Sequence, residues 1–231
     1  MLYGYENVFT ILLMFLAIII VTYAQAKVTG SYRKYKNIKN TKNISGFEVA
    51  RKILDANGLS DIHIVETRGE LTDHYDPSRK VIRLSKDIFH GTSIAAASVA
   101  AHEVGHAIQD KDNYGYMKIR AKLVPVVNLI TYIGYIVIFI SALFGSGLVG
   151  GVEIGIGIIL ATLIFQIVTL PVEFDASKRA KQELIKLDIL ADGEVVGVKG
   201  MLDAAALTYV ASVVSTLLSL LRLVIMARER D

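Results

Sequence analysis

Four apolar runs limit what this sequence can fold into, because each is about as long as a helix that crosses a lipid bilayer. They comprise residues 8–24, 123–144, 148–170 and 204–221. Hydrophobic residues make up 53% of the 231 residues, which is more than a typical soluble domain contains. We therefore predict a mainly α-helical membrane protein with three to four transmembrane helices.

The first run is predicted to remain as an anchor, although Ala24-Gln25-Ala26 resembles a signal-peptide cleavage site. A cleaved signal begins with a basic segment. Residues 1–7 contain Glu6 and neither Lys nor Arg, so residues 1–26 are interpreted as an N-terminal transmembrane anchor.

Basic residues predict the orientation, because Lys and Arg collect on the cytoplasmic side of membrane proteins. Six follow the first run closely: Lys27, Arg33, Lys34, Lys36, Lys39 and Lys42. Others precede the second run and follow the third, whereas residues 145–147 between these runs contain none. The pattern predicts a multi-pass protein of the cell membrane with its N-terminus outside, a cytoplasmic domain at 27–122, a transmembrane hairpin at 123–170 and a cytoplasmic helical segment at 171–203.

The last segment, residues 204–231, is predicted to be a membrane-embedded helix and a tail. Polar residues spaced by four and three draw a stripe along one helical face: Thr208, Ser212, Ser215, Ser219 and Arg222. Such a stripe either packs against other helices or faces a wet cavity. A partly embedded helix and a fourth crossing both fit, and we favour the crossing, although it places Arg228 and Arg230 outside.

Residues 27–122 have the signals of a small α+β domain. Ser45-Gly46-Phe47-Glu48 is a capping-box pattern at a helix start, and Asn57-Gly58 is expected to end that helix. Strand-like composition occurs at residues 62–65, 71–75 and 81–84. With a turn at residues 76–79, these segments predict a short antiparallel sheet.

The segment His102-Glu103-Val104-Gly105-His106 is the most informative for chemistry. It lies in a helix predicted from an N-cap at Thr92-Ser93 to about Gln109. Residues four apart share a helical face, so His102 and His106 can bind one metal ion while Glu103 projects beside them. This H-E-x-x-H arrangement is typical of zinc metalloproteases, with the glutamate as general base. The chain has no cysteine, so one Zn²⁺ must be held by His and carboxylate side chains.

Glu173 is the candidate third ligand, because it follows the third apolar run directly. Two membrane crossings separate it from His106, so both residues are expected at the same membrane surface. Its alternative role is an interfacial carboxylate that pairs with Lys178 or Arg179.

Residues 101–109 (AHEVGHAIQ), 73–77 (DHYDP) and 171–177 (PVEFDAS) together resemble the YugP-type membrane zinc metallopeptidases. More widely, the chain is similar to gluzincins, which implies His102, His106 and Glu173 as ligands and Glu103 as catalytic base. In related membrane enzymes of the HtpX and CAAX-protease kind, an aspartate four residues after the ligand glutamate braces a zinc-bound histidine. This chain has Ser177 at that position.

Three further residues are candidates for supporting roles. A metal-bound imidazole normally donates its second N–H to a carboxylate, carbonyl or water, so Asp175 is an alternative brace to Ser177. A donor to the developing oxyanion is also expected, and His74 or Tyr209 could supply it.

These features predict an integral membrane zinc endopeptidase with a small α+β peptidase domain at the cytoplasmic face. Its expected partners are the lipid bilayer and protein or peptide substrates, including unfolded membrane-protein segments, and an oligomer or a regulatory partner stays open. The basic run at 27–42 is assigned to anionic lipid and not to nucleic acid. The alternative is a non-catalytic membrane scaffold or regulator with a structural zinc site, which would be closed by a fourth protein ligand such as His74. A transporter is less favoured, because the apolar runs carry few ionisable residues.

Overall fold

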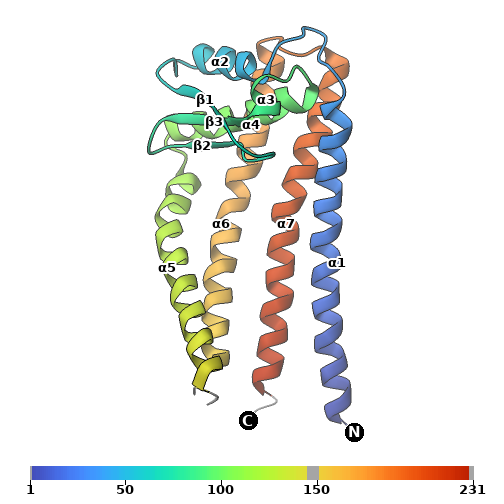
Figure 1. Cartoon of the computed structure of the whole chain (residues 1–231), viewed down its shortest axis with the longest axis vertical. Coiled ribbons are helices and arrows are strands. Elements are labelled where there is room, and N and C mark those ends of the chain that lie inside the picture. The colour runs from blue at the N-terminus through green and yellow to red at the C-terminus, as the bar shows by residue number, and fades with distance from the viewer. Residues whose placement is uncertain (1, 145–150, 229–231) are drawn as a thin grey trace. The chain divides into compact units, whose positions relative to one another are not determined.

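The computed structural model describes residues 2–144 and 151–228. Within them the chain folds into two compact units, whose elements are labelled in Figure 1. The first unit contains residues 2–25, 118–144, 151–170 and 208–228, and the second contains residues 26–117 and 171–207. The predicted link at 145–147, the first residues of the third apolar run and Arg230 lie outside the described residues.

The first unit is built from parts of four long helices: α1 (Leu2–Lys36), α5 (Gly115–Phe144), α6 (Gly151–Lys186) and α7 (Asp192–Arg228). Each contains a segment long and apolar enough to cross a membrane. Large apolar side chains on them are exposed, among them Phe15, Tyr135 and Ile164, as expected of a surface that contacts lipid. The prediction of a mainly helical chain is confirmed, and these helices are long and apolar enough to cross a membrane. The side of the membrane on which each helix end lies stays a prediction.

The second unit contains a three-stranded sheet of β1 (His63–Thr67), β2 (His74–Asp76) and β3 (Val81–Ser85), in the order β1-β3-β2. The β2–β3 hairpin is antiparallel, as predicted, but β1 pairs with β3 in parallel, with His63 opposite Val81 and Thr67 opposite Ser85. The prediction of an antiparallel sheet is therefore wrong for β1. The chain reverses twice between β1 and β3, so β3 returns in the direction of β1 and becomes the central, largely buried strand.

The second strand also begins later than predicted, at His74 instead of residue 71. Leu71 has a φ of +56°, which lies outside the extended region that a strand needs. The link between β1 and β2 therefore includes residues 68–73.

Helix α2 (Gly46–Ala56) begins and ends as predicted. The Ser45 side chain accepts a hydrogen bond from the Glu48 amide, and the Glu48 carboxylate accepts one from the Ser45 amide, so the capping box is confirmed. Past the helix end, Gly58 has a φ of +66°, a conformation that glycine adopts without strain. The buried face of α2 includes Val49, Ile53 and Leu54, which join the core of the second unit.

Helix α4 (Ile94–Lys111) occupies the centre of this core. Its predicted N-cap is confirmed, because the Ser93 hydroxyl accepts a hydrogen bond from the Ala96 amide at 3.1 Å. Almost every side of α4 is buried, including the side that carries His106. Its many alanines allow the surrounding elements to pack closely against it.

The short helix α3 (Lys86–Phe89) connects β3 to the segment before α4.

Candidate metal centre

Helix α4 places two imidazoles one turn apart. The rings of His102 and His106 have centroids 4.8 Å apart and lie nearly perpendicular, at 83°. His106 is 8% exposed, and Glu103 between them in sequence is 7% exposed. The motif thus lies on a helix, as its spacing predicted, and the structure adds that this helix is buried.

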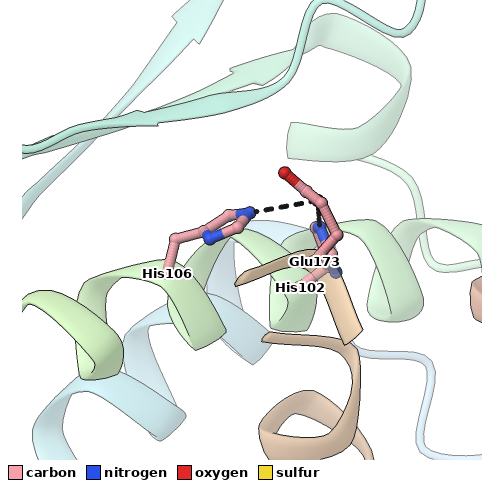
Figure 2. Close-up of side chains that lie close together, drawn as sticks. All are labelled: His102, His106 and Glu173. Atoms are coloured by element: carbon pink, nitrogen blue, oxygen red, sulfur yellow. Dashed lines mark hydrogen bonds and ion pairs between the residues drawn. The ribbon is translucent and has the colours of Figure 1, made fainter. Parts of the chain in front are cut away.

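Helix α6 brings Glu173 to both imidazoles, within the second unit. Its Oε2 atom lies 3.3 Å from Nε2 of His102 and 3.6 Å from Nε2 of His106 (Figure 2). One ligand atom from each of the three residues lies within 4.8 Å of the others. Glu173 is 3% exposed, so its carboxylate is directed into a site that water barely reaches. The residues that the sequence analysis selected as metal ligands therefore do converge.

A glycine explains how closely α4 and α6 approach beside these ligands. A Cβ atom on Gly105 would lie 2.5 Å from the carbonyl oxygen of Ala176, a distance that no real side chain tolerates. Only glycine allows the two backbones to approach at this point. The position between Glu103 and His106 thus has a structural reason that the motif itself does not reveal.

The electrostatics of the site favour a cation between these side chains. Burial alone would lower the pKa of the His106 imidazole, but the hydrogen bond and negative charge of Glu173, with the charge of Glu103, raise it above its ordinary value. Two buried carboxylates near two imidazoles form an environment that stabilises positive charge, from a proton or from a metal ion.

Gln109, which the sequence analysis did not assign to the site, positions His106. The Gln109 Oε1 atom lies 3.0 Å from Nδ1 of His106. Its Nε2 donates to the carbonyl of Val172 at 2.7 Å and to Oδ2 of Asp175 at 2.9 Å. Gln109 is completely buried, so this single amide joins the helix of the two histidines to the turn of α6 that carries Glu173.

The two proposed braces behave differently. The Ser177 hydroxyl lies 3.3 Å from Nδ1 of His102, so serine contacts the imidazole from the position where the resemblance places an aspartate. Asp175 touches Gln109 and accepts a hydrogen bond from Nε of Arg179 at 2.6 Å. It therefore acts on His106 through Gln109 and not by direct contact.

Asp73 lies within the electrostatic field of Glu103. It accepts hydrogen bonds from the amide and hydroxyl of Ser85. Burial raises the pKa of Asp73 above its ordinary value, and the charge of Glu103 adds to the increase, although the bonds from Ser85 oppose it. Asp73 and Glu103 are 30 positions apart in the chain, and no motif links these two carboxylates.

Of the two candidate oxyanion donors, His74 is not part of this group. His74 is exposed, and its Nδ1 lies 2.8 Å from the carbonyl oxygen of Thr72. Tyr209 belongs to the first unit, whereas the three converging ligands belong to the second. The roles suggested for His74 and Tyr209 stay predictions.

Two histidines one turn apart, a glutamate from a second helix and a further carboxylate beside them are typical of zinc metallopeptidases. Here they occur in a chain whose described residues include four candidate membrane-spanning helices.

Comparison with known proteins agrees with this class. The chain belongs to the family described as "putative neutral zinc metallopeptidase", whose profile matches residues 10–228. It is 46% identical over 204 residues to "Putative membrane protease YugP" of Bacillus subtilis strain 168, which covers 87% of this chain and 89% of that protein. The resemblance drawn from the motifs is therefore confirmed. No solved structure matches the chain.

Proposed function

We propose that the protein is a membrane zinc endopeptidase in which His102, His106 and Glu173 hold one Zn²⁺ and Glu103 is the general base. The observation that carries this proposal is the convergence of the three ligand side chains from α4 and α6. Two imidazole nitrogens and one carboxylate oxygen form the ligand set of a gluzincin-type site.

The donor set fits zinc in its chemistry and in its orientation. Both histidines direct Nε2 toward Glu173, while their Nδ1 atoms contact Ser177 and Gln109. Hydrogen bonding at one ring nitrogen fixes the tautomer and leaves the other nitrogen free to bind metal. The pair is thus held with both metal-binding nitrogens directed to a common point.

When bound, zinc lowers the pKa of a water molecule and polarises the carbonyl of the scissile peptide bond. The Glu103 carboxylate accepts the proton of the attacking water and passes it to the leaving amine. Its low exposure limits competition from bulk water. The charge of Glu103 contributes to the raised pKa of Asp73.

The number of ligands supports an enzyme over a scaffold. Structural zinc sites use four protein ligands, whereas catalytic sites use three and leave a position for water. Among the residues that the structure describes, this cluster contains three ligand side chains, and His74 is not one of them. A scaffold or regulator with a structural zinc site therefore stays the second choice.

The proposed substrates are membrane proteins or segments close to the membrane. Strand β2 is at an edge of the sheet, and an edge strand can bind an extended peptide by main-chain hydrogen bonds. Such binding selects unfolded or extended segments, including the ends of damaged membrane proteins. The basic residues after the first apolar run support a catalytic site on the cytoplasmic side of the cell membrane, with the N-terminus outside.

The test compares cells that contain the wild-type protein with cells that contain Glu103→Gln. We expect peptide termini in the membrane proteome that depend on Glu103, and a loss of cleavage by purified protein of about 10²- to 10⁴-fold, because a general base contributes that much. Bound zinc should not change. The matched control is Glu70→Gln, which makes the same chemical change at an exposed loop position. Undiminished cleavage by Glu103→Gln would refute the mechanism, and wild-type protein that binds zinc but generates no new termini would favour the scaffold.

A further inference from the structure

The C-terminal part of the polar stripe of α7, namely Ser215, Ser219 and Arg222, lines a cavity that the metal centre does not use. Within the first unit, a cavity of about 320 Å³ lies between α1 and α7. Helix α7 contributes Ser219 and Arg222 to its wall, and α1 contributes Leu13, Ala17 and Val21. Both helices, labelled in Figure 1, are long and apolar enough to cross a membrane. We therefore expect the bilayer to surround this polar wall.

Arg222 is the unusual group of this cavity. Its Nε atom is enclosed and has no hydrogen-bond partner among the described residues. A guanidinium keeps its positive charge in proteins. A cation in a membrane-spanning helix is costly unless an anion or water compensates it, and such residues commonly mark a binding site.

The other walls of the cavity do not supply the missing negative charge. None of its lining residues is acidic. The Ser219 hydroxyl donates to the carbonyl of Ser215 at 2.9 Å, so its proton is already engaged within α7. The remaining surface toward α1 is mainly apolar. A complementary ligand therefore combines an anionic group with a hydrocarbon part.

The position of Arg222 along α7 suits the headgroup of a lipid. It lies six residues before Arg228, where the described helix ends, and this separation corresponds to about 9 Å at 1.5 Å per residue. Arginine side chains extend from such depths to the membrane interface while their methylene groups stay in apolar surroundings. A phosphate at the interface is thus within reach of this guanidinium.

We propose that the groove between α1 and α7 binds one anionic phospholipid, with its phosphate on the Arg222 guanidinium and an acyl chain against Ala17 and Val21. Arginine pairs with phosphate through two parallel hydrogen bonds, which would satisfy the enclosed Nε atom. The apolar wall of α1 accounts for the preference for a lipid over a free anion. This site is independent of the proposed peptidase activity.

The test uses the purified full-length chain, stripped of native lipid and then titrated with phosphatidylglycerol, phosphatidylcholine or inorganic phosphate. Native mass spectrometry counts the bound lipid, and the thermal unfolding midpoint reports binding, because a ligand of the folded state stabilises it. The variants are Arg222→Leu and Arg228→Leu, which remove the same charge from one helix at a partly buried and an exposed position. A third variant, Ala17→Leu, fills the groove and keeps the guanidinium.

We expect wild type and Arg228→Leu to bind one phosphatidylglycerol per chain and to unfold at a higher temperature in its presence. Arg222→Leu should bind it about tenfold to a hundredfold more weakly, because a charge-assisted hydrogen bond is lost. Ala17→Leu should also bind phosphatidylglycerol more weakly. If Arg222→Leu does not fold, binding by Ala17→Leu tests the proposal. Three outcomes would overturn the proposal. The first is phosphatidylglycerol binding by Arg222→Leu or Ala17→Leu that equals that of wild type. The others are stabilisation of wild type by phosphatidylcholine, or by inorganic phosphate, that equals its stabilisation by phosphatidylglycerol.

Discussion

Replacing Gln109 with leucine should weaken zinc binding, although Gln109 itself is not a proposed ligand. The substitution removes the acceptor that lies 3.0 Å from Nδ1 of His106 and both donor contacts of the amide to α6. Leucine has a similar volume but no polar atom, so the buried Nδ1–H would be left without a partner. The imidazole would then lose the contact that fixes its tautomer and orientation.

The magnitude follows from these contacts. An unsatisfied buried N–H costs about 1–3 kcal/mol, and each lost hydrogen bond of the amide about 0.5–1.5 kcal/mol. Asp175 keeps its hydrogen bond from Arg179, so losing the bond from Gln109 to Asp175 should cost about 0.5 kcal/mol, the low end of that range. Together these terms destabilise the fold by about 2–5 kcal/mol. Partners of metal-bound histidines change metal affinity by about tenfold to a hundredfold, which corresponds to about 1.4–2.8 kcal/mol.

Zinc affinity is measured by competition with a chromophoric chelator, and stability by denaturant unfolding of the zinc-free protein. Gln109→Glu separates the effect on zinc affinity from the effect on stability. Its carboxylate can still accept a hydrogen bond from His106, but it places a second negative charge beside Asp175. That variant should keep zinc affinity while it loses stability. Ser98→Ala is the control in the same helix, since it removes only the bond from the buried Ser98 hydroxyl to Ile94 and should leave zinc binding unchanged. Wild-type zinc affinity in Gln109→Leu would refute the positioning role.

Two further outcomes follow from the geometry of the site. Gly105→Ala should force α4 away from Ala176, destabilise the protein by about 1–3 kcal/mol through overpacking and weaken zinc binding. The control Gly115→Ala, where a Cβ meets no atom within 4 Å, should change zinc affinity little. Thermal unfolding with and without zinc measures both variants, and equal effects in the two would contradict this prediction. Because the pKa of His106 is raised, the zinc-free fold should gain stability from the protonated imidazole at low pH and lose that gain as the pH rises through the raised pKa. Zinc must displace this proton, so the affinity of the protein for zinc should fall as the pH is lowered through the same pKa. A zinc affinity that does not change with pH in chelator titrations would exclude proton competition at this histidine.

The features that the sequence predicted well depend on the local spacing of residues or on the number of membrane crossings between them. Residues four apart share a helical face, so the arrangement of His102 and His106 needed no tertiary information. The caps at Ser45 and Ser93 involve residues three positions away and are equally local. Glu173 was selected because an even number of crossings returns the chain to the same surface, and the structure does place it beside both imidazoles.

The parts that sequence missed depend on contacts between distant segments. Gln109 bonds to residues 63 and 66 positions away, and nothing in its local sequence distinguishes it from a surface glutamine. The tight fit of Gly105 against Ala176 is likewise visible only once α4 and α6 are packed. The parallel pairing of β1 has the same origin, because either free edge of the β2–β3 hairpin could accept a third strand.

Zinc X-ray absorption of the purified full-length protein, with Glu173→Ala as its partner sample, tests whether His102, His106 and Glu173 share one ion. We expect zinc to be coordinated by two imidazoles and by oxygen donors at about 2.0–2.2 Å, and we expect Glu173→Ala to lose zinc under the same conditions. A first shell with three or more imidazoles, or an unchanged zinc content and spectrum in Glu173→Ala, would contradict a site made by His102, His106 and Glu173.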